Sequence, residues 1–191
     1  MMSFHSFSLY VRSAVPDVPW EHWVVMGVVT LAVVLWGRIS KKYSIYGTIF
    51  LGLAVLFALY LLEATVFVRI GRDNNVYSGL DLKGEYRRLV DGYIGTQMMM
   101  LFNVLVFIPF GFALSEFLCS TRFIRAKRCL GIVSLAGFAL SLTMECFEWL
   151  FKVGMFEITD MVLNTLGAFL GATISLAVRE LFRQFRSGKK V

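Results

Sequence analysis

Residues 141–171 read SLTMECFEWLFKVGMFEITDMVLNTLGAFLG, and this stretch decides the fold. It holds the end of one long apolar segment and the start of the next, separated by a short break at Gly154. An apolar run of about 20 residues is long enough to cross a bilayer as a helix, so the stretch predicts two neighbouring membrane helices. Four polar side chains interrupt the two segments: Glu145, Glu148, Asp160 and Asn164. Such groups are costly inside apolar helices, which makes them candidates for a site.

The composition of the whole chain also indicates a membrane protein. Of its 191 residues, 58% are hydrophobic, and the mean hydropathy is +0.70, whereas soluble domains contain roughly 45–50% apolar residues. The apolar residues gather in five runs, which predict an all-α, polytopic membrane helical bundle in a single domain over residues 1–191. The predicted transmembrane spans cover about 20–37, 44–68, 96–118, 129–151 and 158–178.

Two details of the bundle are expected from local sequence. Pro109 lacks the backbone N–H that a helix interior uses, so the third span should be kinked or interrupted there. The charged connection 69–95 joins the second and third spans. Within it, Glu85, Arg88 and Leu89 have the spacing of a short amphipathic helix that lies on the membrane surface.

The distribution of Lys and Arg predicts the orientation of the chain. Twelve of the 19 lie in the first and third connections and the C-terminal tail, and seven lie on the opposite side. Because cytoplasmic loops retain positive charge, we expect the N-terminus outside and the C-terminus inside the bacterial cytoplasmic (inner) membrane. Anionic lipid headgroups account for these cations better than nucleic acid does, so membrane lipid is an expected partner and nucleic acid is not.

Cysteine and histidine give no sign of metal or redox chemistry. Cys119, Cys129 and Cys146 lack the spacing of metal ligands and lie in or beside apolar runs, where cysteine packs as a small hydrophobe. His5 and His22 lie far from any cluster of ligands and are interpreted as incidental. Neither a metal nor a cofactor is expected.

The predicted orientation brings polar side chains of several spans near the outer face of the membrane. The candidate ligand-binding cluster comprises Glu63, Asn103, Ser141, Glu145, Glu148, Asp160 and Asn164. Ser141, Glu145 and Glu148 share one helix face, because they are separated by four and then three residues. Glu116 and Glu180 are exceptions, since they lie at the inner ends of their spans.

Helix packing is expected to hold this cluster inside the bundle. Asp160 and Asn164 share a helix face with Gly167 and Gly171, and a Gly-x-x-x-Gly spacing lets a neighbouring helix approach closely. The residues expected at such helix contacts are Pro109, Gly111, Gly167 and Gly171.

The charge of the cluster needs compensation. A carboxylate at mid-bilayer costs about 2.5–3.5 kcal/mol on insertion scales. Glu145 and Glu148 also repel each other, so either one is protonated or a cation lies nearby. The candidate counter-ions are Arg69, Arg72, Arg87, Arg88 and Lys152. The alternative for Glu63, Glu157 and Asp160 is that they reach water at helix ends. The alternative for Glu145, Glu148 and Asn164 is that they only join helices.

Two blocks of sequence resemble the VanZ-like family of small bacterial membrane proteins. The first is Asn103-Val-Leu-Val-Phe-Ile-Pro109-Phe-Gly111, which is similar to the family's Asn…Phe-x-Pro-Phe-Gly segment. The second is Ser141-x-x-x-Glu145 followed by Asp160-x-x-x-Asn164-Thr-Leu-Gly167-Ala-x-x-Gly171. The resemblance implies a multispan protein linked, through the family's founding member, to low-level resistance to teicoplanin, a lipoglycopeptide that acts on the cell envelope.

The chain departs from the family pattern at two positions. The family usually has Gln three residues after the Glu of the second block, where this chain has Glu148. It usually has Gly-Arg before the Asp segment, where this chain has Gly154-Met155. The loss of that arginine removes the obvious counter-ion of Glu145. Either a basic residue of the second connection replaces it, or the site differs from that of the typical family members.

Three functions remain open from the sequence. The favoured one is a non-enzymatic envelope protein whose outward-facing polar pocket binds an amphiphile: a lipid, a lipid-linked glycan or a lipoglycopeptide antibiotic. The second is an intramembrane lipid-phosphate hydrolase or transferase in which Glu145 and Glu148 divide the acid and base roles. However, no placed histidine, serine nucleophile turn or Asp-rich metal motif supports it, so no catalytic residue is assigned. The third is an accessory subunit whose acids pair with arginines of a membrane-protein partner.

Overall fold

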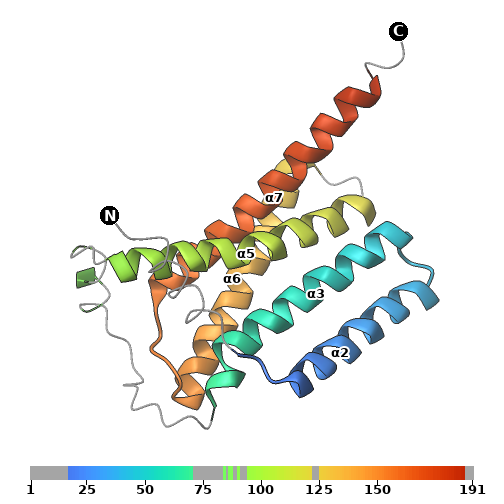
Figure 1. The fold of residues 1–191 in the computed structure, drawn as a ribbon. Helices are drawn as coiled ribbons and strands as arrows, with labels where there is room; N and C mark the ends of the chain where they lie inside the picture. The colour runs from blue at the N-terminus through green and yellow to red at the C-terminus, as the bar shows by residue number, and fades with distance from the viewer. Residues whose placement is uncertain are drawn as a thin grey trace.

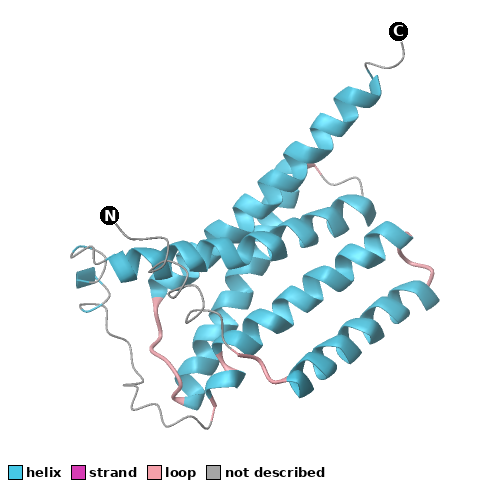
Figure 2. Cartoon of the chain, viewed as in Figure 1, coloured by secondary structure: helices cyan, strands magenta, loops and turns pink. Residues whose placement is uncertain are grey.

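A computed structural model describes residues 17–70, 84, 86, 87, 90, 94–121 and 125–187. Within these residues the regular elements are all helices, with no strand (Figure 1, Figure 2). They are α2 (Trp20–Ile39), α3 (Ile45–Thr65), the short 3-10 helix η1 (Phe67–Arg69), α5 (Ile94–Thr121), α6 (Ala126–Phe151) and α7 (Ile158–Ser187). The five α-helices are each long and apolar enough to cross a membrane. The all-α prediction with five spans is therefore confirmed.

The helices run past the predicted spans mainly where the sequence turns basic. α6 begins at Ala126 and α7 continues to Ser187, whereas the apolar runs cover only 129–151 and 158–178. Arginine and lysine are good helix formers, so the helix need not end where the apolar run does. The start of α3 is set by a cap, because the Ser44 hydroxyl accepts the backbone N–H of Gly47 at 3.0 Å.

α5 passes through Pro109 without interruption. Of the two outcomes expected at Pro109, an interruption does not occur, and a kink stays a prediction. A proline inside a membrane helix is tolerated where neighbouring helices compensate for the lost hydrogen bond. The helix is held closely at this level, because a Cβ atom on Gly111 would meet the backbone carbonyl of Ala168 in α7.

α5 and α7 form the centre of the bundle. α6 packs against α7, α3 packs against α5, and α2 packs against α3 (Figure 1). A Cβ atom on Gly167 would meet the carbonyl oxygen of Val104, and one on Gly171 would meet that of Ile108. These two glycines therefore let the α5 and α7 backbones approach closely. The core around them contains Leu61, Phe107, Phe110, Val133, Ala168 and Ala172.

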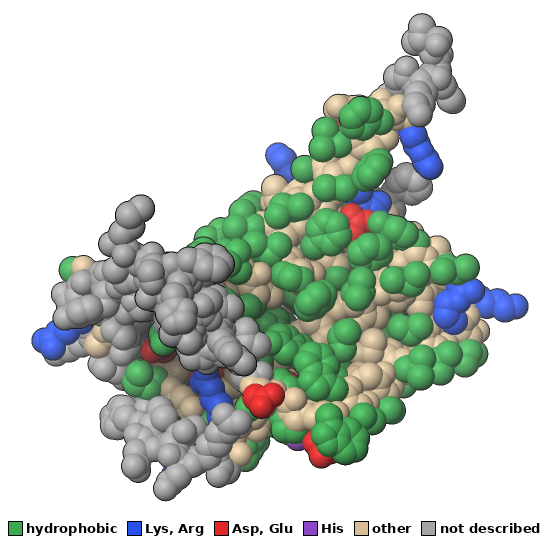
Figure 3. All heavy atoms as spheres, viewed as in Figure 1, with side chains coloured by type: hydrophobic (Ala, Val, Ile, Leu, Met, Phe, Trp, Pro, Cys, Tyr) green, Lys and Arg blue, Asp and Glu red, His purple; other side chains and the backbone are tan. Residues whose placement is uncertain are grey.

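The long sides of the bundle are apolar, and its two ends differ in charge. Figure 3 shows hydrophobic side chains covering the helices along their length, which is the surface that lipid chains would contact. One end of the bundle holds the α2–α3 and α5–α6 connections and the C-terminus of α7, and we call it the basic end. Its exposed cations are Arg38, Lys41, Lys42, Arg125, Lys127, Arg128, Arg183 and Arg186. The opposite end, with the end of α3, the start of α5 and the α6–α7 turn, is the pocket end.

Little of the connection between α3 and α5 belongs to the described residues. Gly84, Tyr86, Arg87 and Val90 are helical. The predicted amphipathic helix depends on Glu85, Arg88 and Leu89, which lie outside the described residues, so it stays a prediction.

Candidate functional site

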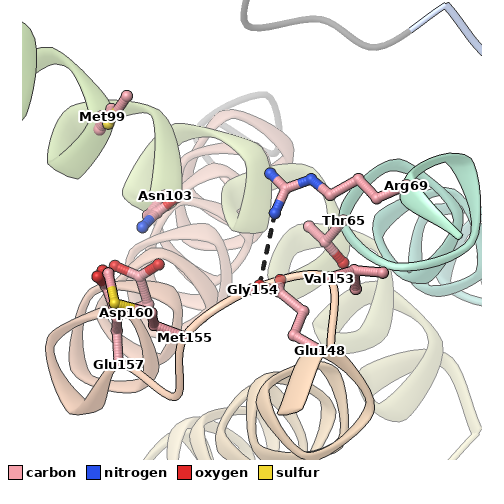
Figure 4. Close-up of a pocket in the computed structure, with 10 residues that line it drawn as sticks. All are labelled: Thr65, Arg69, Met99, Asn103, Glu148, Val153, Gly154, Met155, Glu157 and Asp160. Carbon is pink, nitrogen blue, oxygen red and sulfur yellow. Dashed lines mark hydrogen bonds and ion pairs between the residues drawn. The ribbon is translucent and has the colours of Figure 1, made fainter. Parts of the chain in front are cut away.

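A pocket of about 530 Å³ opens at the pocket end of the bundle (Figure 4). The end of α3 with η1, the first turns of α5, the end of α6, the α6–α7 turn and the start of α7 build its walls. The lining residues are Thr65, Arg69, Met99, Asn103, Glu148, Val153, Gly154, Met155, Glu157 and Asp160. Three members of the predicted cluster thus share one pocket: Asn103, Glu148 and Asp160.

Glu148 is fixed between a cation and a glycine. Its Oε2 lies 3.5 Å from Nη1 of Arg69, which is one of the candidate counter-ions (Figure 4). Its carboxylate also lies against Gly154, where an added Cβ atom would overlap Oε2. The absence of a side chain at Gly154 therefore lets Glu148 turn toward Arg69.

The other candidate counter-ions are not placed in this way. Arg87 and Lys152 are exposed, and within the described part of the chain neither forms an ion pair with a carboxylate. Lys152 instead ends α6, with a φ of 56° in the left-handed region. Arg72 and Arg88 lie outside the described residues.

The opposite side of the pocket is acidic. Glu157 comes from the α6–α7 turn and Asp160 from the first turn of α7 (Figure 4). Met155 lines the pocket at the position where the family pattern has arginine. Among the described residues, the lining therefore carries three carboxyl groups and one guanidinium.

Glu145 lies behind the pocket wall. It is only 4% exposed and is not among the lining residues. Its Oε2 accepts the backbone N–H of Glu157 at 2.7 Å. Glu145 thus connects α6 to the segment that enters α7, and it supports the wall that Glu157 belongs to.

Asn164 and Ser141 form a buried pair below this level. The Asn164 Nδ2 donates to the Ser141 Oγ at 2.9 Å, which joins α7 to α6. The Oδ1 of Asn164 is buried and accepts no hydrogen bond from the described residues. The pair does not line the pocket, and its position fits the interhelical role that the sequence left open for Asn164.

Glu63 is placed elsewhere. Its Oε1 forms a hydrogen bond with Nδ1 of His22 in α2, and Glu63 does not line the pocket. Beside this pair, the rings of Trp23 and Tyr60 stack with centroids 5.6 Å apart. The interpretation of His22 as incidental is therefore wrong, since His22 supplies a partner for the one acid of the second span.

A second buried polar cluster lies near the basic end around Glu116, which is 2% exposed. Arg179 of α7 donates to its Oε2 through Nη2 at 2.6 Å and Nε at 3.0 Å. The Tyr46 hydroxyl donates to the same oxygen at 2.6 Å, and the Ser175 hydroxyl donates to Oε1 at 2.7 Å. From the sequence, Glu116 was only an exception to the clustering of acids at the outer face. The spacing of four between Ser175 and Arg179 was the signal that could have placed it.

The cysteines and the acids give no metal site within the described residues, where no three His, Cys, Asp or Glu side chains are grouped to hold an ion. The Sγ atoms of Cys119 and Cys129 lie 3.7 Å apart, and both residues pack in or against the core. Cys146 is exposed on α6.

Comparisons with known proteins agree with the two sequence blocks. A family model described as VanZ/LLP1 matches residues 47–179. Protein VanZ of Enterococcus faecium is 32% identical over 119 residues, which are 61% of this chain and 61% of that protein. The chain therefore spans less than two thirds of the length of that relative. No solved structure is significantly similar to the chain.

Proposed function

The chain belongs to the VanZ/LLP1 family of membrane proteins, as its sequence blocks predicted, and we propose that it binds the polar part of an amphiphile in its pocket. The protein acts in the bacterial cell envelope, and the pocket faces outward. The ligand is a lipid, a lipid-linked glycan or a lipoglycopeptide antibiotic of the teicoplanin type, with the family resemblance favouring the last.

The observation that carries this proposal is a polar pocket at one end of an otherwise apolar bundle. Charge and hydrogen-bonding groups come from Arg69, Asn103, Glu148 and Asp160. Apolar contact comes from Met99, Val153 and Met155. Binding sites for small molecules commonly combine a few polar groups with apolar walls in this way. A ligand with a polar head and an apolar tail could place its head here and its tail along the lipid-facing helices.

The orientation follows from the opposite end of the molecule. The basic end carries eight exposed Lys and Arg side chains among the described residues. Because positive charge stays on the cytoplasmic side, the basic end is assigned inside and the pocket outside. An outward-facing pocket could meet an antibiotic or an envelope lipid without crossing the membrane.

The lining favours binding over catalysis. None of the ten lining residues is His, Ser or Cys, which are the usual nucleophiles and bases of hydrolases. Glu145, the expected partner of Glu148 in acid–base chemistry, is turned to the backbone of Glu157. The two carboxylates are therefore not presented together to a substrate.

The test is protection of cells combined with analysis of bound lipid. Wild-type protein and the Glu148→Gln and Asp160→Asn variants are produced in a teicoplanin-susceptible bacterium, and the minimum inhibitory concentration is measured. Mass spectrometry of the purified proteins then identifies any amphiphile they retain. Both variants should lose protection and retained ligand, while Glu21→Gln, an exposed acid outside the pocket, should keep them. Variants that fold normally and behave as wild type in both assays would refute the proposal.

A further inference from the structure

The last turns of α7 extend beyond the helices beside them, at the end of the molecule opposite to the pocket (Figure 1). We propose that these turns, residues 179–186, form a binding site for anionic phospholipids. This site would exist whether or not the pocket binds a ligand, because the two lie at opposite ends of the bundle.

Beyond Arg179, the side chains of the projecting segment lie at the surface of the described structure. Every side chain from Glu180 to Arg186 is exposed. At 1.5 Å per residue, residues 179–186 span about 10 Å along the helix. The headgroup layer on each side of a bilayer is about 5–8 Å thick. The segment is therefore long enough to pass through the whole layer of lipid headgroups.

One face of this segment is apolar. Phe182 is 69% exposed, Phe185 is 73% exposed and Leu181 is also exposed. Phe185 lies three positions after Phe182 and four positions after Leu181, so the three side chains lie on one side of the helix. In water such a stripe would be unfavourable, but at the boundary between headgroups and acyl chains it would contact lipid.

The neighbouring face is basic. Arg179, Arg183 and Arg186 are separated by four and three residues and therefore share a face. Arg179 is held by Glu116, which fixes the start of the segment against α5. Arg183 lies 2.9 Å from Glu180 in an exposed pair. An exposed pair of this kind is weak, so a lipid phosphate could replace Glu180.

The surroundings add positive charge and almost no opposing charge. Six further exposed cations lie at the basic end, in the α2–α3 and α5–α6 connections and in the adjoining turns of α2 and α6. Within the described residues, Glu180 is the one exposed acid at this end. The field here therefore attracts anions. Arginines beside exposed phenylalanines fit a ligand that is anionic and apolar at once, as a phospholipid with net negative charge is.

The full-length protein in detergent is titrated with short-chain phosphatidylglycerol, with phosphatidylcholine of the same chain length and with the water-soluble headgroup glycerophosphoglycerol. Wild type should prefer phosphatidylglycerol over both. The double variant Arg183→Gln/Arg186→Gln should bind it about fivefold more weakly for each cation removed. Phe182→Ala/Phe185→Ala should also weaken binding, and Glu180→Gln should leave it equal or stronger.

A matched control removes two exposed cations away from α7. Arg87→Gln/Lys152→Gln loses the same charge and should bind phosphatidylglycerol as wild type does. Equal affinity for the two phospholipids, or wild-type affinity in the Arg183→Gln/Arg186→Gln protein, would overturn the proposal. A third outcome would also overturn the proposal: weaker phosphatidylglycerol binding by Arg183→Gln/Arg186→Gln, but wild-type binding by Phe182→Ala/Phe185→Ala. The site would then bind the anionic headgroup without contacting the lipid chain.

Because every substituted side chain in these variants is exposed, they should fold as wild type, and circular dichroism checks this. The pocket variants Glu148→Gln and Asp160→Asn should retain phosphatidylglycerol binding. A failure of the pocket proposal therefore leaves this inference intact, and the reverse also holds.

Discussion

The carboxylate of Glu148 occupies the space that a Cβ atom on Gly154 would need. The backbone of the α6–α7 turn and the side chain of the last α6 acid thus share one small volume beside Arg69. This contact explains why a glycine next to Met155 is part of the pocket rather than a simple break between two helices.

Gly154→Ala should therefore act like a pocket substitution. The new methyl group would push Glu148 away from Arg69 and reshape the wall. We expect loss of teicoplanin protection similar to that of Glu148→Gln, measured as the minimum inhibitory concentration. Gly131→Ala is the matched control, because an added Cβ there meets nothing within 4 Å. Full protection by the Gly154→Ala protein would show that the position of Glu148 does not matter.

Arg69→Gln should separate function from stability. The Arg69 side chain is 45% exposed and its ion pair with Glu148 is long at 3.5 Å, so its loss should change the free energy of unfolding by less than about 1 kcal/mol. The pocket would nevertheless lose the one cation among its described lining residues. We expect nearly unchanged thermal unfolding in detergent together with reduced protection. A large drop in Tm would instead make Arg69 a structural residue.

Glu116→Ala should destabilise the bundle without changing the pocket. It removes the acceptor of three donors and leaves Arg179 without its buried partner. Loss of one partner of a buried pair costs about 3–5 kcal/mol, and the third of the Arg179 side chain that is exposed lowers the expectation to about 2–3 kcal/mol. Thermal unfolding in detergent measures this, with Glu180→Gln in the exposed pair as a control that should match wild type. A Glu116→Ala protein as stable as wild type would contradict the assigned role.

Gly171→Ala should disrupt the contact between α5 and α7. The methyl group would meet the carbonyl oxygen of Ile108, and such overpacking costs typically about 1–3 kcal/mol. The fall in Tm should exceed that of Gly131→Ala, which lies in open space. Equal Tm values for the two variants would mean that the helices can separate at no cost.

Cysteine labelling should test the orientation. In a variant with the three native cysteines replaced by alanine, Lys152→Cys lies at the pocket end and Lys42→Cys at the basic end. A membrane-impermeant maleimide added to whole cells should label the first and not the second. The reverse pattern would place the pocket on the cytoplasmic side and exclude direct contact with an extracellular antibiotic.

The number and order of the helices follow from the sequence because a bilayer demands long apolar runs, and each run is visible by composition. The residues at which the helices begin and end are harder to predict from composition. α7 continues to Ser187 through Arg179, Arg183 and Arg186, since a helix can leave the membrane without ending. α5 likewise continues through Pro109.

The site was only partly predictable for a related reason. Helical spacing places Glu145 and Glu148 on similar faces, but it does not show how far each helix is rotated toward its neighbours. In the structure Glu148 lines the pocket, whereas Glu145 is turned to the backbone of Glu157. Glu63 does lie near the end of its span, but its carboxylate contacts His22, which lies on a helix whose register with α3 no local pattern reveals.

The close contact between α5 and α7 also limits how a ligand could travel. Below the pocket, Phe107 and Ala168 are fully enclosed, and the carbonyls of Val104 and Ile108 leave no room for a methyl group at Gly167 or Gly171. Along this contact the described backbones of α5 and α7 therefore leave no space between them. We therefore expect a molecule held in the pocket to advance no further into the bundle between these two helices.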